Sequence, residues 1–303
     1  MIQRIHHLNC VSACPLGGAL MDGRSRSLRG RLVCHCILVE TEAGLVLLDT
    51  GYGLMDVADP VERLSWFFLA LLDPDFREEL TAVRQIEALG FSARDVRHIV
   101  LTHLDFDHAG GLDDFPEAIV HLLTTERETA EAQRTWLDRQ RYRPQQWSSR
   151  SRWRTYDADA GGGDWFGFAA VRELEGVPPE VLLVPLIGHT FGHAGIAVQH
   201  GPRWILMAGD AYFDHREMNL DHPRCRVGLR FYQWMMEQDR AARLVNQQRL
   251  RELIDEHGRE IHVISSHDPY EFEALTGHPM AQPLEPARFP QHVYAEYPSL
   301  VPK

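Results

Sequence analysis

The 303-residue sequence has almost no lysine: of its 31 lysines and arginines, only Lys303 is a lysine. Against 43 acidic residues, this gives a formal net charge of −12. Proteins that bind nucleic acids or anionic membranes need clustered cations to neutralise phosphates. The charge therefore disfavours both kinds of partner, and we expect a small-molecule substrate instead.

Long apolar segments and a leader sequence are also missing. The longest apolar run, Trp66–Leu72, is far shorter than the ~20 residues of a membrane-spanning helix. The first ten residues lack the basic and then apolar pattern of a secretory signal. We therefore expect a cytoplasmic protein in which this run forms a buried helix or a lid.

Cysteine is scarce and its count is odd, which argues against a disulfide framework and fits a reducing compartment. The five residues are Cys10, Cys14, Cys34, Cys36 and Cys225. Cys34 and Cys36 lie in VCHCILVE, a pattern typical of a β-strand. A cysteine-based zinc site is one interpretation of this pair, but we favour small buried residues of a strand.

Arginine is concentrated between Arg134 and Arg154, where seven arginines accompany one acidic residue, Asp138. Tryptophan and tyrosine are interleaved with them. The segment could hold an anionic or aromatic ligand, or it could form a solvated or interface-forming insertion, with a homodimer as one outcome. Because arginine supplies nearly all the positive charge of this chain, we favour the insertion.

No low-complexity linker divides the chain, so we expect one domain over residues 1–303. We predict strands at 31–40, 45–48, 96–101, 118–123, 181–185, 196–199, 204–208 and 261–265. Helices are predicted over 61–89 with a break at 73–75, over 125–137 and over 228–257. Insertions are expected at about 54–95 and 126–168, and a proline-rich extended arm at about 269–303. This order predicts a mixed α/β domain.

The stretch LTHLDFDHAGG at 101–111 places His103, Asp105, Asp107 and His108 within six residues. In an extended chain, the first three point to one side and the apolar residues between them to the other. His108 can join them if a helix begins there. These groups would crowd and repel one another without a cation among them, although by itself the stretch could also be a capping loop.

Three further polar stretches follow predicted strands. They are GHTFGH at 188–193, Gly209-Asp210, and His267. Four separate strand ends that each supply imidazole or carboxylate groups are hard to explain as polar residues of a core. Imidazole with carboxylate is the ligand mixture expected for zinc, iron or manganese.

Taken in order, these motifs resemble those of the metallo-β-lactamase superfamily. They are LLDTG at 47–51, HLDFDH at 103–108, GHTFGH at 188–193, MAGD at 207–210 and SSHD at 265–268. The resemblance covers residues 30–268 and is nearest in motif order to the acyl-homoserine lactonase-like branch. It implies a four-layer αββα sandwich with helical insertions and a dinuclear site at the strand ends between the two sheets.

The resemblance also implies which residues bind metal. One ion would be held by His103, Asp105 and His193, the other by Asp107, His108 and His267, with Asp210 bridging them. Asp49 would accept a hydrogen bond from a ligand imidazole and fix its tautomer. We interpret His189 as a residue that shapes its loop rather than as a ligand.

The sequence departs from the usual HxHxDH pattern, because Asp105 stands where the second histidine is expected. A carboxylate in place of a neutral imidazole adds negative charge, which lowers Lewis acidity and favours harder ions. We expect two divalent ions, zinc first, with iron or manganese as alternatives. A carboxylate here also resembles the HxExDH of diiron flavoproteins, but no flavin-binding domain is evident.

The reaction that the resemblance implies is hydrolysis of a small lactone, ester, thioester or amide by a metal-bridging hydroxide, which is available near neutral pH. Asp107 would also carry a proton to the leaving group. The hydroxyl of Tyr212 would stabilise the oxyanion, or the side chain merely packs. The alternatives are a phosphodiesterase or nuclease of the same superfamily, a diiron redox enzyme, and a non-catalytic binding protein.

Overall fold

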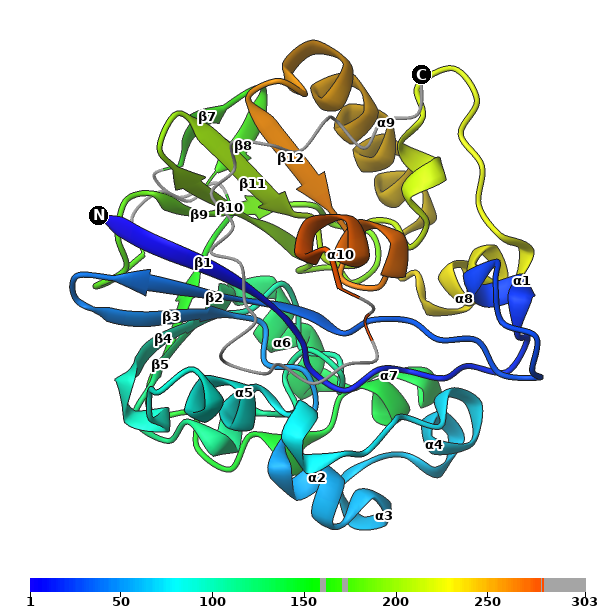
Figure 1. Cartoon of the computed structure of the whole chain (residues 1–303), viewed down its shortest axis with the longest axis horizontal. Helices are drawn as coiled ribbons and strands as arrows, with labels where there is room; N and C mark the ends of the chain where they lie inside the picture. Colours follow the sequence, from blue (N-terminus) through cyan, green and yellow to red (C-terminus); the bar gives the residue numbers. More distant parts are fainter. Residues whose placement is uncertain (159–161, 171–173, 279, 281–303) are drawn as a thin grey trace.

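Two β-sheets face each other and helices cover their outer faces (Figure 1). The computed structural model describes residues 1–158, 162–170, 174–278 and 280. The first sheet has the order β1-β2-β3-β4-β5-β6. Its strands are β1 (Ile2–Asn9), β2 (His35–Thr41), β3 (Gly44–Leu48), β4 (Val96–Val100), β5 (Ile119–Leu123) and β6 (Trp153–Tyr156). Strands β3 to β6 run parallel, so their carboxyl ends meet at one edge of the sheet.

The second sheet has the order β12-β11-β10-β9. Its strands are β9 (Val181–Pro185), β10 (Ala194–His200), β11 (Arg203–Met207) and β12 (Ile261–Ile264). Strands β11 and β12 are parallel, so the residues that follow them lie side by side. A separate hairpin pairs β7 (Gly163–Trp165) with β8 (Phe168–Ala170).

The helical and 3-10 segments fill the connections. They are α1 (Ala19–Asp22), α2 (Leu54–Ala58), α3 (Pro60–Arg63), α4 (Trp66–Leu72), η1 (Glu78–Leu80), α5 (Ala82–Ala88), η2 (Ala93–Asp95), η3 (Leu112–Asp114), α6 (Thr124–Ala132), α7 (Trp136–Arg141), η4 (Pro144–Gln146), η5 (His215–Met218), α8 (Val227–Met236), α9 (Arg240–His257) and α10 (Pro269–Thr276). Among the described residues, none of these helices has the length and apolarity to cross a membrane.

The alternation of side chains along the strands builds the four layers. In β2, Ile37 and Val39 pack between the sheets against residues of β10 and β11 such as Ile196. Leu38, in the same strand, faces the opposite way into a core shared with α5 and α6. Residues of β9, β11 and β12 pack on their outer side against α9. The predicted αββα sandwich is therefore confirmed.

Most predicted elements are present, and the differences have physical reasons. The predicted strands at 31–40 and 45–48 pair as β2 and β3, the break after α4 is as expected, and the helix predicted over 228–257 is divided into α8 and α9. Strands β1, β6, β7 and β8 were not predicted, because β1 contains charged and histidine side chains and the other three lie in an arginine-rich and then glycine-rich segment.

The extended arm predicted from residue 269 is wrong for Pro269–Thr276, which form α10. Asp268 caps this helix by accepting hydrogen bonds from the backbone N–H groups of Tyr270 and Glu271, and Pro269 suits its first turn. Residues 281–303 of the arm lie outside the described residues. None of the five cysteines forms a disulfide.

We expect the interface between the sheets to carry much of the stability. Ile196 is fully buried there, so Ile196→Ala should lower the free energy of unfolding by about 2–5 kcal/mol. Ile187 is 41% exposed on a loop, and Ile187→Ala should change it by less than about 0.5 kcal/mol. Urea unfolding measures both, and equal losses would contradict this view of the core.

Candidate metal centre

Residues from separate strand ends converge into groups whose ligand atoms all lie within 4.8 Å of one another. The first cluster consists of His103, Asp105, His189 and Asp210. The second cluster consists of His108, Asp210 and His267. A third group, Cys34, Asp107 and His267, adjoins the second cluster. All these residues are buried, and Asp210 belongs to both clusters.

Asp210 directs one carboxylate oxygen to each cluster. Its Oδ2 lies 3.3 Å from His189 Nε2 and 3.8 Å from His103 Nε2. Its Oδ1 lies 3.1 Å from His267 Nε2 and 3.4 Å from His108 Nε2. Burial raises the pKa of this carboxyl, but the surrounding histidines outweigh burial and hold the pKa well below its usual value. This arrangement suits a carboxylate between two cations.

In the second cluster, two unprotonated nitrogens face each other. His108 Nδ1 lies 2.8 Å from Asp49 Oδ2, and His267 Nδ1 lies 2.8 Å from the carbonyl oxygen of Val33. Both partners can only accept, so we assign a proton to each Nδ1. The two Nε2 atoms, 3.2 Å apart, then present lone pairs to each other unless a cation or proton lies between them. The donors therefore fit a metal ion.

The pKa values of His108 and His267 also indicate that positive charge is stabilised at this place. Burial lowers the pKa of His108 and of His267, but nearby carboxylates, Asp210 foremost, outweigh burial and raise both well above the usual value. The site is thus a pocket of negative potential in which a cation is stabilised.

Asp49 makes the hydrogen bond that was expected of it. Besides accepting from His108, its carboxylate accepts from the backbone N–H and the hydroxyl of Thr102, each at 2.8 Å. Asp49 has a left-handed backbone (φ 52°) where β3 ends, a conformation that aspartate tolerates better than most residues. This turn places its carboxylate beneath the 102–108 loop.

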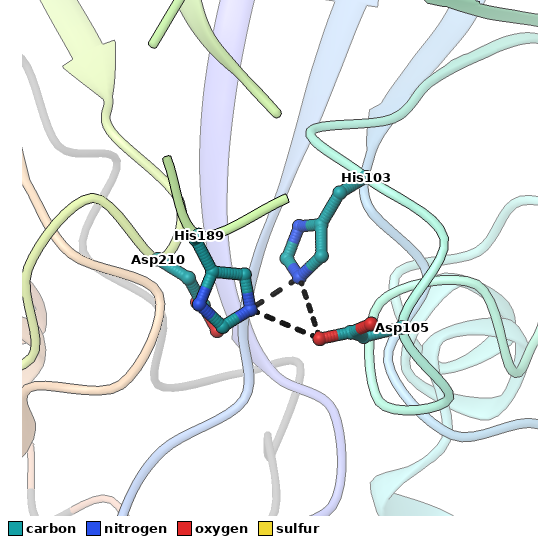
Figure 2. Close-up of side chains that lie close together, drawn as sticks. All are labelled: His103, Asp105, His189 and Asp210. Atoms are coloured by element: carbon teal, nitrogen blue, oxygen red, sulfur yellow. Dashed lines mark hydrogen bonds and ion pairs between the residues drawn. The ribbon is translucent and has the colours of Figure 1, made fainter. Parts of the chain in front are cut away.

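In the first cluster, His103 has one nitrogen without a partner. The hydroxyl of Thr102 donates to Asp49, so it accepts from His103 Nδ1 at 2.8 Å. The buried His103 Nε2 then carries a lone pair and makes no hydrogen bond. It points toward Asp105, whose Oδ2 is 3.3 Å away (Figure 2). Buried polar atoms are rarely left unpaired, so this nitrogen also fits a metal ligand.

The structure brings His189, rather than His193, into the first cluster. His193 Nδ1 donates to the carbonyl oxygen of Leu186 at 2.8 Å, and its Nε2 accepts from the backbone N–H of Asp210 at 2.9 Å. Both nitrogens are thus occupied by the main chain. His189, interpreted from sequence as loop-shaping, has its Nε2 3.0 Å from Asp105 Oδ2 (Figure 2). The two histidines are four residues apart in one motif, which the sequence could not distinguish.

Asp105 is held by a buried arginine that sequence reasoning missed. Arg141, at the end of α7, donates from Nε to Asp105 Oδ1 at 2.6 Å and from Nη2 to Oδ2 at 2.5 Å. Nη2 also lies 2.8 Å from His189 Nε2, and Nη1 donates to the carbonyl oxygen of Met236. Burial raises the pKa of Asp105, but Arg141 outweighs burial and holds the pKa well below its usual value.

This pair changes the expected charge of the site. A carboxylate and a guanidinium together are neutral, as is the histidine that Asp105 replaces. The extra negative charge that favoured iron or manganese is therefore offset. The arginine-rich segment was the signal in the sequence that could have indicated Arg141. A carboxylate that is buried in place of a neutral group needs a cation nearby, and this segment offers one.

Asp107 and Cys34 lie beside the second cluster. Asp107 Oδ2 is 3.6 Å from His267 Nε2, and its Oδ1 is 3.9 Å from His108 Nε2. Burial raises the pKa of Asp107, and the two histidines only partly oppose this effect. Burial also raises the pKa of the Cys34 thiol to about 11. Our interpretation of Cys34 as a packing residue did not anticipate this position.

The contacts of Tyr212 favour a packing role. Its buried hydroxyl donates to Glu271 Oε1 at 2.8 Å, and Glu271 belongs to neither cluster. The next residue, Phe213, stacks instead on the ring of His267, with centroids 5.2 Å apart. Tyr232 of α8 packs edge-on against Phe213. Burial raises the pKa of Tyr232, and the carboxylates of Asp107, Asp105 and Asp210 raise it further.

Removing Arg141 should leave a buried, unpaired carboxylate. We expect Arg141→Met to lower the free energy of unfolding of the chelator-treated protein by about 3–5 kcal/mol. Arg139→Met, on the exposed side of α7, should change it by less than about 0.5 kcal/mol. Adding Asp105→His to Arg141→Met should restore part of the loss. Strictly additive losses in urea unfolding would show that the two residues are not coupled.

Comparisons with known proteins agree with this geometry. A family model described as the metallo-beta-lactamase superfamily matches residues 29–255. A probable metallo-hydrolase of Mycobacterium tuberculosis is 40% identical over 266 residues, which cover 88% of this chain and 80% of that protein. An N-acyl homoserine lactonase of Bacillus thuringiensis is 34% identical over 95 residues, which cover 31% of this chain and 38% of the lactonase.

Solved structures share the fold. An N-acyl homoserine lactone hydrolase with N-hexanoyl-L-homoserine at its catalytic metal center aligns with a TM-score of 0.67 at 21% identity, over 90% of this chain and 96% of that one. A probable metal-dependent hydrolase from Staphylococcus aureus aligns with a TM-score of 0.66 at 18% identity, over 88% and 90% of the two chains. The chain therefore belongs to the metallo-beta-lactamase superfamily and is a metal-dependent hydrolase.

Proposed function

We propose that the protein is a dinuclear hydrolase of a small lactone, ester, thioester or amide, with a lactone as the first candidate. The observation that carries this proposal is the carboxylate of Asp210, which directs Oδ2 to the first cluster and Oδ1 to the second. Two ions bound in these clusters would supply Lewis acidity and a water with a pKa near 7. Imidazole with carboxylate favours zinc, with iron or manganese as alternatives.

Asp107 is the proposed proton carrier. It lies beside His108 and His267 and is 7% exposed, against 2% for Asp105, whose oxygens are both held by Arg141. Its ion-pair contacts in the described part of the chain are imidazoles, so its carboxylate can accept a proton and pass it to the leaving oxygen. Asp105 would instead hold its position as a fixed ligand.

Tyr232 is the proposed donor to the oxyanion, in place of Tyr212. The hydroxyl of Tyr212 is committed to Glu271, whereas the ring of Tyr232 packs against Phe213, which stacks on His267. A hydroxyl placed there can donate to the oxygen that becomes negative during attack on a carbonyl. The sequence assigned this role to Tyr212, and the hydrogen bond from Tyr212 to Glu271 is the reason that we propose Tyr232 instead.

The surroundings of the clusters suit an apolar acyl group. Phe68, Phe106, Phe213 and Met236 form part of one buried apolar cluster next to the site. Lactone hydrolysis by structural relatives supports this substrate class, and the acidity of the chain makes a phosphodiesterase or nuclease the second candidate.

Both cation positions depend on Asp210. Wild-type protein loaded with zinc and dialysed should hold two ions per chain, and Asp210→Asn should hold at most one. Its kcat on a lactone should fall at least about 10²-fold, because Lewis-acid stabilisation is worth several kcal/mol. His222→Ala, at an exposed site, should retain two ions. If metal analysis finds only one ion in the wild type, the proposal is restricted to a mononuclear site. The guanidinium of Arg141 would then supply the positive charge in place of the second ion.

The two tyrosines should separate catalysis from stability. Tyr232→Phe should lower kcat on a lactone by about 10²-fold with little change in melting temperature, since a developing oxyanion loses its donor. Tyr212→Phe should lower the melting temperature, because Glu271 loses a buried donor, and leave kcat nearly unchanged. The reverse pattern would restore the role first predicted for Tyr212.

The substrate class is tested by assaying zinc-loaded protein on N-acyl homoserine lactones of increasing chain length, aryl esters, thioesters and phosphodiesters. We expect the highest kcat/KM for a lactone, rising with acyl chain length because the chain contacts apolar side chains. Preference for a phosphodiester would favour the second candidate. Failure on all four classes with two ions bound would overturn the hydrolase assignment proposed for these substrates.

A further inference from the structure

We propose that the thiol of Cys34 is a ligand, as thiolate, of the ion in the second cluster. The inference rests on the proposed function, because it extends the ligand set of a cation position described above. Cys34, Asp107 and His267 present one ligand atom each within 4.8 Å of one another, and all three residues are buried. They would give the second ion a sulfur ligand, whereas the first cluster has only nitrogen and oxygen.

The backbone holds Cys34 firmly at this place. Its N–H donates to Asn9 Oδ1 at 3.1 Å, and its carbonyl accepts from the N–H of Cys10 at 2.7 Å. The preceding residue, Val33, accepts the Nδ1 proton of His267. One short segment therefore both accepts the proton that orients the imidazole and holds the backbone of Cys34 beside it.

A second, independent feature points to a ligand at the same place. Asp210 Oδ1 is buried and makes no hydrogen bond, although it lies 3.1 Å from His267 Nε2. His108 Nε2 faces His267 Nε2 at 3.2 Å, as described above. A carboxylate oxygen and two imidazole nitrogens thus meet in the second cluster, and a cation bound there would satisfy all of them together. Cys34 adjoins this cluster through His267, which belongs to both groups.

Cys36, a neighbouring cysteine, lies in different surroundings from Cys34 and serves as a comparison for it. It lies within β2 and packs on the outer side of the first sheet, in the core that contains Cys10 and Leu38. Cys34 precedes the strand, packs in a different apolar cluster with Phe213 and Tyr232, and reaches the metal centre. The two thiols are two residues apart, yet only Cys34 is near the candidate ligands among the described residues.

A sulfur ligand would change which metal ion the second cluster prefers. Thiolate is a soft ligand that favours zinc over manganese or magnesium. As the Zn–S bond forms, the S–H bond breaks and its proton is released to solvent, so no oxidant or reductant is needed. The second position should therefore select zinc more strongly than the first.

Zinc X-ray absorption on the full-length protein tests the proposal directly. Wild type loaded with two zinc ions should show a sulfur shell at about 2.3 Å. Cys34→Ser should lose this shell and should release one zinc more readily to a chelator. Cys36→Ser is the matched control and should keep the shell. Cobalt loading provides a second readout, because a sulfur-to-cobalt charge-transfer band should appear in wild type and in Cys36→Ser but not in Cys34→Ser or Cys34→Ala.

The outcomes separate this inference from the proposed function. A wild type that binds two zinc ions with only nitrogen and oxygen neighbours overturns the role of Cys34 and leaves the hydrolase proposal intact. A sulfur shell that survives in folded Cys34→Ser, judged by circular dichroism, also overturns it. A wild type that binds no zinc at all overturns the proposed function and this inference with it.

Discussion

The structure of the site depends on one constraint: unpaired acceptors from both sheets are brought together and need positive charge between them. The 102–108 loop extends from the first sheet, and Asp210 and His267 follow parallel strands of the second. The ring protons of His108, His267 and His103 lie on Nδ1 and are donated to Asp49, Val33 and Thr102, so the Nε2 lone pairs face the site. This arrangement prepares the centre for cations, whereas Arg141 donates within the first cluster.

The pairing of Asp105 with Arg141 shows how a charged substitution can be accommodated in such a centre. A carboxylate in place of histidine would add negative charge to a buried site, where charges are costly. The bidentate guanidinium removes this excess and also fixes the direction of the carboxylate. Because Arg141 also contacts His189, the same side chain orders two members of the first cluster. The segment between Arg134 and Arg154 is thus anchored by a buried contact, although most of its arginines lie near the surface.

The two clusters differ in their surroundings. The first adjoins a guanidinium, whereas the second adjoins the slightly exposed Asp107, the thiol of Cys34 and the ring of Phe213. If each cluster binds an ion, as proposed, positive charge near one position and a thiol near the other should make the two ions unequal in affinity. Tyr232 of α8, whose ring packs against Phe213, is the proposed source of a hydroxyl at this site.

The sequence by itself determined the sandwich, the family and the segments that converge, because strand periodicity and ordered polar motifs at strand ends are local signals. His103, Asp105, His108, Asp210 and His267 all come to the two clusters as predicted, and Asp107 lies beside the second. Only the tertiary structure brought His189 rather than His193 to the first cluster, paired the hydroxyl of Tyr212 with Glu271 and gave Arg141 a buried place. The reason is that neighbours in one motif share the same local pattern, and their roles depend on hydrogen bonds to residues far along the chain. The positions of Cys34 and Arg141 follow from the packing of distant segments, which no short window of sequence contains.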